Sequence, residues 1–181
     1  CNYEEALKQL ALVRNKDPKN PRVYKLLGTA YVLFNHDEEA LLELNRAHEL
    51  DRDDPEILFN LGGVYLLKDM YESAADAFEK AIKIDPTDTT SYANLAAAYG
   101  MLKIYDKEIS ALKKVLMFEP ENKELRAALS NAYFNSDRFE EAIDAAICVV
   151  EIDEKDTQAY CNLGSCYAAQ NMIDEAIKTF N

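Results

Sequence analysis

The sequence lacks several features on which catalytic and membrane proteins depend. It has no tryptophan, two histidines, five glycines and four cysteines in 181 residues. The glycines form no phosphate-binding loop, and the cysteines and carboxylates around His36 and His48 form no repeating or converging arrangement with the ligand spacing of a metal site. No apolar run could span a bilayer, and no signal peptide or Asn-x-Ser/Thr sequon is present. These absences predict no cofactor, no metal, no membrane insertion and a cytoplasmic location.

Basic side chains are also scarce. Lysine and arginine number 20 against 33 aspartates and glutamates, which gives a formal charge of -13. A chain this acidic repels phosphate backbones, so nucleic-acid binding and binding to anionic membranes are disfavoured. Apolar residues make up 49% of the chain and charged residues 29%, which is typical of a folded soluble protein.

What the sequence does contain is a repeat. Residues 55–88 hold two helical apolar patterns, and the same unit returns on shifting the sequence by 34 residues in either direction. One phase holds tyrosine five times, at Tyr31, Tyr65, Tyr99, Tyr133 and Tyr167. The repeat predicts helix–turn–helix units at 21–54, 55–88, 89–122 and 123–156, the second helix of an incomplete unit at 1–20, and an incomplete unit at 157–181.

Each unit carries helix-boundary signals. An Asn or Asp that can cap a helix precedes every unit, at Asn20, Asp54, Asp88, Asn122 and Asp156. The turn between the two helices centres on a residue type that tolerates the left-handed conformation, at Asn35, Asp69, Asp137 and Asn171. Lys103 is the exception, which predicts a strained or differently shaped turn there.

Small residues recur where the two helices of a unit should approach closely. They are Gly28, Gly62, Ala96, Ser130 and Gly164 on the first helices, and Ala40, Ala74, Ala142 and Ala176 on the second. Neither helix can bury its apolar stripe alone, so stability is expected from stacking of neighbours.

These residues resemble the tetratricopeptide repeat pattern. Unit 55–88 matches it at Leu58, Leu61-Gly62, Tyr65, Ala74, Phe78, Ala81 and Pro86. Departures include Arg126, Ala146 and Glu108, a carboxylate in place of a packed alanine. The resemblance implies an all-α, right-handed superhelix whose first helices line a concave groove. It also implies that the groove binds a peptide segment of a partner protein.

Residues of the groove follow from the family's first-helix positions. The candidate peptide-binding residues are Lys25, Phe59, Asn60, Asn94, Met101, Asn131, Phe134 and Asn162. Asn60, Asn94 and Asn162 share one phase and resemble the asparagine ladder of some tetratricopeptide grooves, because an amide can pair with any peptide backbone. The alternative is that they serve local packing or helix-end bonding. Phe59, Met101 and Phe134 would add apolar contact or belong to the core between repeats.

Two other kinds of site are disfavoured. The family's two-carboxylate clamp for chaperone tails needs five polar residues, and only Lys25 and Asn60 fit it, because Thr29, Thr90 and Asn94 occupy the other places. Glu108 is expected to bond to Ser130 or Tyr133, or to become exposed by rotation of its helix. A single displaced carboxylate without a partner base predicts no catalytic site.

The leading hypothesis is therefore a non-enzymatic interaction scaffold. The alternative is the substrate- or partner-recruiting arm of a larger enzyme or assembly, because both ends fall inside a unit. Cys1 lies at the turn of an incomplete repeat, so a fragment of a longer chain is a better interpretation than a lipidated N-terminus. A third hypothesis is self-association through uncapped apolar ends.

Overall fold

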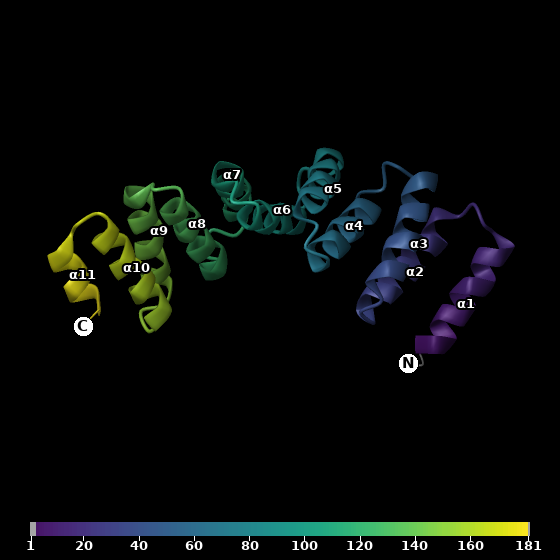
Figure 1. Ribbon diagram of the computed structural model, residues 1–181, viewed down its shortest axis with the longest axis horizontal. Helices are drawn as coiled ribbons and strands as arrows, with labels where there is room; N and C mark the ends of the chain where they lie inside the picture. Colours follow the sequence, from purple (N-terminus) through teal and green to yellow (C-terminus); the bar gives the residue numbers. More distant parts are fainter. Residues whose placement is uncertain (1–2, 181) are drawn as a thin grey trace. The chain divides into compact units, whose positions relative to one another are not determined.

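The computed structural model describes residues 3–180 and contains, in that range, eleven α-helices and no strand (Figure 1). The predicted all-α class is confirmed. The chain divides into two compact units, residues 1–91 and 92–181. Consecutive helices pack in pairs, α2 on α3 and α4 on α5 in the first unit, and α8 on α9 and α10 on α11 in the second.

The first unit holds two complete helix pairs and the helix that precedes them. The pair α2 and α3 contacts the pair α4 and α5 through α3 and α4, and α2 also contacts α4. Its core is built around the fully buried Leu44, Ile57 and Val64. The helices are α1 Tyr3–Lys16, α2 Pro21–Leu33, α3 Asp37–Leu50, α4 Pro55–Leu67 and α5 Tyr71–Ile84.

The second unit repeats the arrangement. Helices α8 and α9 pack on α7 on one side and on α10 on the other, and α8 also contacts α10. Its core includes the buried Leu112, Tyr133 and Cys166. The helices are α6 Thr89–Met101, which begins just before the unit boundary, α7 Tyr105–Leu116, α8 Lys123–Asn135, α9 Phe139–Ile152, α10 Thr157–Ala169 and α11 Ile173–Phe180.

The predicted N-caps are confirmed. Asp54 Oδ1 accepts the backbone N–H groups of Glu56 at 2.9 Å and Ile57 at 3.2 Å. The other four caps accept backbone N–H groups of the following helix in the same way, and they are Asn20, Asp88, Asn122 and Asp156. Each side chain satisfies a donor that the first turn of a helix leaves without a partner.

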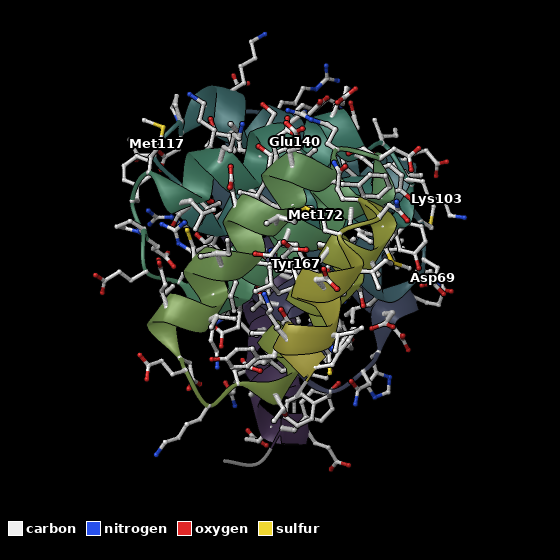
Figure 2. All side chains as sticks on the ribbon, turned by 90° about the vertical axis from the view of Figure 1, so that its left-hand side faces the viewer. Asp69, Lys103, Met117, Glu140, Tyr167 and Met172 are labelled. Atoms are coloured by element: carbon white, nitrogen blue, oxygen red, sulfur yellow. The ribbon has the colours of Figure 1, made fainter. Side chains whose placement is uncertain are left out.

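The predicted left-handed turn residues are confirmed too. All four have φ between 56° and 61°, and they are Asn35, Asp69, Asp137 and Asn171. Lys103 adopts 58°, so the prediction of a differently shaped turn was wrong. The amide three residues beyond the end of each first helix bonds back to the tyrosine carbonyl of that helix, as from Met172 to Tyr167 at 2.9 Å. The equivalent Schellman-type bond from Ile104 to Tyr99 holds Lys103 in a conformation that its side chain disfavours. Figure 2 labels Lys103, Tyr167 and Met172.

Close approach between the helices of a pair depends on the small residues. A Cβ on Gly62 would lie 2.7 Å from the Phe78 ring, and one on Gly164 would lie 2.5 Å from Phe180. Ser130 instead donates its hydroxyl to the carbonyl of Ala142 at 2.8 Å. The first helix therefore carries a small residue wherever the second presents a bulky one.

In the pair α6 and α7, a larger residue on α7 faces a smaller residue on α6. Glu108 stands where the other second helices carry alanine, and Gly100 stands where α4 and α8 carry Leu66 and Phe134. A Cβ on Gly100 would lie 2.9 Å from Glu108 Oε1, so the carboxylate occupies space left by the glycine. The expected bonds from Glu108 to Ser130 or Tyr133 are absent from the described residues, because the Ser130 hydroxyl is committed to α9.

Candidate functional site

The predicted site residues all lie on first helices of the pairs. Helix α2 contacts α4 in the first unit, and α8 contacts α10 in the second, so first helices lie side by side within each unit. The structure distributes the residues over both units. The first unit carries Lys25, Phe59 and Asn60, and the second carries Asn94, Met101, Asn131, Phe134 and Asn162.

Asn60 connects two first helices. Its Nδ2 donates to Thr29 Oγ1 at 3.2 Å, and that hydroxyl donates to the Lys25 carbonyl one turn earlier at 2.9 Å. The chain bridges α4 to α2 through neutral side chains that are half-buried. Asn60 therefore has a packing role between repeats, which was one of the two interpretations left open.

The other asparagines have different surroundings. Asn162 Oδ1 accepts from Gln158 Nε2 at 2.9 Å, a bond within α10. Asn94 is half-buried and Asn131 is exposed. Equal spacing in the sequence thus does not give these side chains equal bonding, and the asparagine ladder stays a prediction.

The apolar candidates divide into core and surface. Phe59 packs edge-on against Phe78 with ring centroids 5.9 Å apart, and Phe134 packs in the same way against Phe139 at 5.5 Å. Both phenylalanines are half-buried and contribute to the contact between the helices of a pair. Met101 is different, because 59% of it is exposed at the end of α6.

The Lys25 ammonium is bound by the chain's own carboxylates. It lies 2.9 Å from Asp54 Oδ2 and 2.5 Å from Glu56 Oε2, and only 14% of its side chain is exposed. Burial lowers the pKa of Lys25, but the hydrogen bonds to Glu56 and Asp54 raise it overall. Lys25 therefore joins α2 to the N-terminus of α4, a position that sequence reasoning had assigned to peptide binding.

A pocket beside Phe59 was missed by the sequence analysis. It measures about 430 Å³ and is lined by Phe59 with Pro55, Glu56, Asp85, Asp88 and Thr90. The available signal was a difference between repeats. Phe59 stands 34 residues after Lys25, so the second repeat replaces a buried cation with an aromatic ring.

Other chemical groups are isolated. Burial raises the pKa of the Glu108 carboxyl, and burial also raises the pKa of the Cys166 thiol although Ser130 opposes that shift. Within residues 3–180, no three His, Cys, Asp or Glu side chains gather at metal-binding distance. None of the helices in the same range has both the length and the apolar character needed to cross a membrane.

Family models decide what the chain is. Four tetratricopeptide repeat models match it, at residues 1–58, 55–88, 77–109 and 157–181. The chain belongs to the tetratricopeptide repeat family. A comparison of the sequence with curated proteins gave no match.

Solved structures of tetratricopeptide repeat proteins share the fold. The MamA protein is 22% identical with a TM-score of 0.83, and the match covers 88% of this chain and 87% of MamA. YrrB, described as a TPR protein with an unusual peptide-binding site, is 24% identical with a TM-score of 0.81 over 94% of this chain and 91% of YrrB. MamA from Desulfovibrio magneticus RS-1 is 22% identical with a TM-score of 0.80 over 88% and 90%. These likenesses confirm the predicted fold family.

Proposed function

We propose that this tetratricopeptide repeat chain is an interaction scaffold, rather than an enzyme, and that it binds a peptide segment of a partner protein along its first helices. The observation that carries the proposal is a series of exposed apolar side chains in one phase of the repeat. Leu33 is 74% exposed, Leu67 is 60% exposed and Met101 is 59% exposed, each at the end of a first helix.

Exposed apolar patches mark the interaction sites of proteins. Each is followed by the same left-handed turn, so the position is fixed relative to its own helix pair. Leu26, also on α2, is 53% exposed and adds to the apolar surface of the first unit. The peptide-binding site described for YrrB supports assigning a peptide to such a surface. The formal charge of -13 disfavours nucleic acid as the partner.

The test is a peptide selected from a displayed library against residues 1–181. Leu67→Glu should weaken its binding by about tenfold or more, because an apolar side chain that the bound peptide would cover is replaced by a charge. Leu42→Glu is the matched control, since Leu42 is 70% exposed but lies on the second helix α3. Equal losses in the two variants, or a loss only in the Leu42 variant, would contradict binding along the first helices.

A further inference from the structure

Three junctions between repeats carry a pair of aspartates three residues apart. We name them junction 54 (Asp51 and Asp54), junction 88 (Asp85 and Asp88) and junction 156 (Asp153 and Asp156). The second aspartate of each pair caps the following first helix, so its carboxylate position is fixed by backbone bonds. The three junctions therefore present acidic groups on equivalent backbone.

At two of these junctions the chain supplies its own cation. Lys25 binds Asp54 at 2.9 Å and Glu56, in the first turn of α4, at 2.5 Å. Lys123 binds Asp153 at 2.9 Å and Asp156 at 3.0 Å. The two lysines come from different positions of their repeats, and each binds the capping aspartate of its junction. An ammonium is thus bound by Asp54 at one junction and by Asp153 and Asp156 at the other.

Junction 88 has the aspartates without the lysine. The position equivalent to Lys25 is Phe59, and the position equivalent to Lys123 is Pro55. Among the described residues, neither Asp85 nor Asp88 forms an ion pair. The space that a lysine would fill is instead the pocket of about 430 Å³ beside Phe59.

Neutral groups hold the two carboxylates in place. Asp85 Oδ1 accepts the Thr87 hydroxyl at 2.6 Å and the Thr87 amide at 3.0 Å. These bonds lower the pKa of Asp85, and the bond from the Thr87 hydroxyl has the larger effect. Asp88 accepts the Thr90 amide at 3.0 Å and the Ser91 hydroxyl at 2.5 Å. Hydrogen bonds of this kind orient a carboxylate and leave its charge uncompensated.

We infer that the pocket at junction 88 binds the side chain of a lysine or arginine from the partner peptide, an inference that rests on the proposed function. The apolar stem of either side chain fits against Phe59, and its charged end reaches the carboxylates that have no internal cation. A cation over the phenylalanine face adds a further attraction. An acidic side chain is repelled there, and an apolar one leaves both charges without a partner.

The experiment is an NMR titration of the whole chain with two ten-residue peptides. They are identical except at one position, where one peptide has lysine and the other has norleucine. The lysine peptide should shift the amide signals of Phe59, Asp88 and Thr90, and the norleucine peptide should bind about tenfold more weakly. The double variant Asp85→Asn with Asp88→Asn should remove that preference. It should still fold, because Asn20 and Asn122 cap helices in this chain.

Two further variants make the test specific. Asp153→Asn is the matched control, since it removes an equivalent charge where Lys123 is already bound, and it should leave the preference for lysine unchanged. Phe59→Lys should abolish the preference by filling the pocket with an internal ammonium. A titration with spermidine tests whether a free amine binds instead. If spermidine bound junction 88 and the lysine peptide did not, the assignment to a peptide would be overturned.

The inference and the proposed function can fail separately. Equal binding of the two peptides, or a lysine preference that survives the double Asn variant, would overturn the lysine pocket. If the selected peptide still loses affinity in the Leu67→Glu variant, the scaffold function stands without that pocket. A lysine preference at junction 88 combined with no Leu67 effect would leave the pocket and remove the apolar first-helix site.

Discussion

Junction 54 and junction 88 have the same aspartate spacing and the same kind of helix cap, but different side chains beside the cap. Both have an aspartate cap that accepts two backbone or hydroxyl donors of the next helix. At junction 54 the cap also binds Lys25, whereas at junction 88 the equivalent residue is Phe59 and an open pocket remains. The comparison teaches that caps and glycines fix the repeat, while the fifth residue of the preceding first helix is a lysine that closes junction 54 and a phenylalanine that leaves junction 88 open.

The largest effect is expected from the part that the two repeats share. Gly28 faces Leu44 in one repeat and Gly62 faces Phe78 in the next. Gly62→Ala should destabilise the chain by about 1–3 kcal/mol, because its Cβ would overlap a fully buried ring. Urea unfolding measures this change.

Gly63 provides the control next to it in the sequence. Nothing lies within 4 Å of a Cβ on Gly63, so Gly63→Ala should stabilise helix α4 by about 0.5–1 kcal/mol. If the two variants changed stability in the same direction, the close approach of α4 and α5 would not be what requires glycine at position 62.

Removing the Lys25 ammonium makes junction 54 resemble junction 88, which has no internal cation among the described residues. Lys25→Met should destabilise the chain by about 1–2 kcal/mol, because it leaves the largely buried Asp54 carboxylate without its partner. Lys80→Met is the control, because Lys80 and Asp76 are more than half exposed and such pairs contribute about 0–1 kcal/mol. Thermal unfolding at low salt compares the two.

The difference between wild type and Lys25→Met should depend on pH. Burial raises the pKa of Asp54, but bonds from Lys25 and from the amides of Ile57 and Glu56 lower it overall. A lowered carboxyl pKa gives stability that is present above the ordinary value and lost as pH falls through the folded value. The two proteins should therefore converge in acid, and a difference that persisted there would contradict the ion pair.

The third repeat sharpens the comparison with a smaller effect. Glu108 is half-buried against Gly100, and burial raises the pKa of its carboxyl. A raised carboxyl pKa means that the folded protein loses stability as pH rises from the ordinary value through the folded one. Glu108→Gln should therefore stabilise the chain at pH 7 and have little effect in acid. Unfolding curves at both pH values would show an equal change if burial of the charge were unimportant.

The smallest effect is expected at the turn of that repeat. Lys103 has a φ of 58°, a value that asparagine tolerates better than lysine. Lys103→Asn should raise stability by about 0.5–1 kcal/mol, and Asp69→Lys should lower it by a similar amount. A calorimetric melting temperature that fell in the Lys103 variant would contradict the strain.

The elements of the fold could be predicted from the sequence because their causes are local. A cap such as Asp54 bonds to the next two or three amides, and a turn residue such as Asp69 needs only its own φ. Lys103 shows the limit of this reasoning, since the bond from Ile104 to the Tyr99 carbonyl imposes a conformation that its residue type disfavours.

The site could be predicted only by position. The repeat places Lys25, Asn60 and Met101 on first helices, but what each side chain binds depends on neighbours about 30 residues away. Lys25 is bound by Asp54 and Glu56, and Asn60 bonds to Thr29. No single-residue rule contains those partners, whereas the exchange of lysine for phenylalanine at position 59 was visible in the aligned repeats.

The central claim is that junction 88 lacks a cation which a partner peptide supplies. The most direct measurement is a carbon-13 NMR titration of the Asp85 and Asp88 carboxyl groups with and without the lysine peptide. A bound ammonium should lower the pKa of Asp85 below its value in the free chain and shift the Asp88 carboxyl signal, and the norleucine peptide should change neither. Identical titration curves with the two peptides would contradict the account.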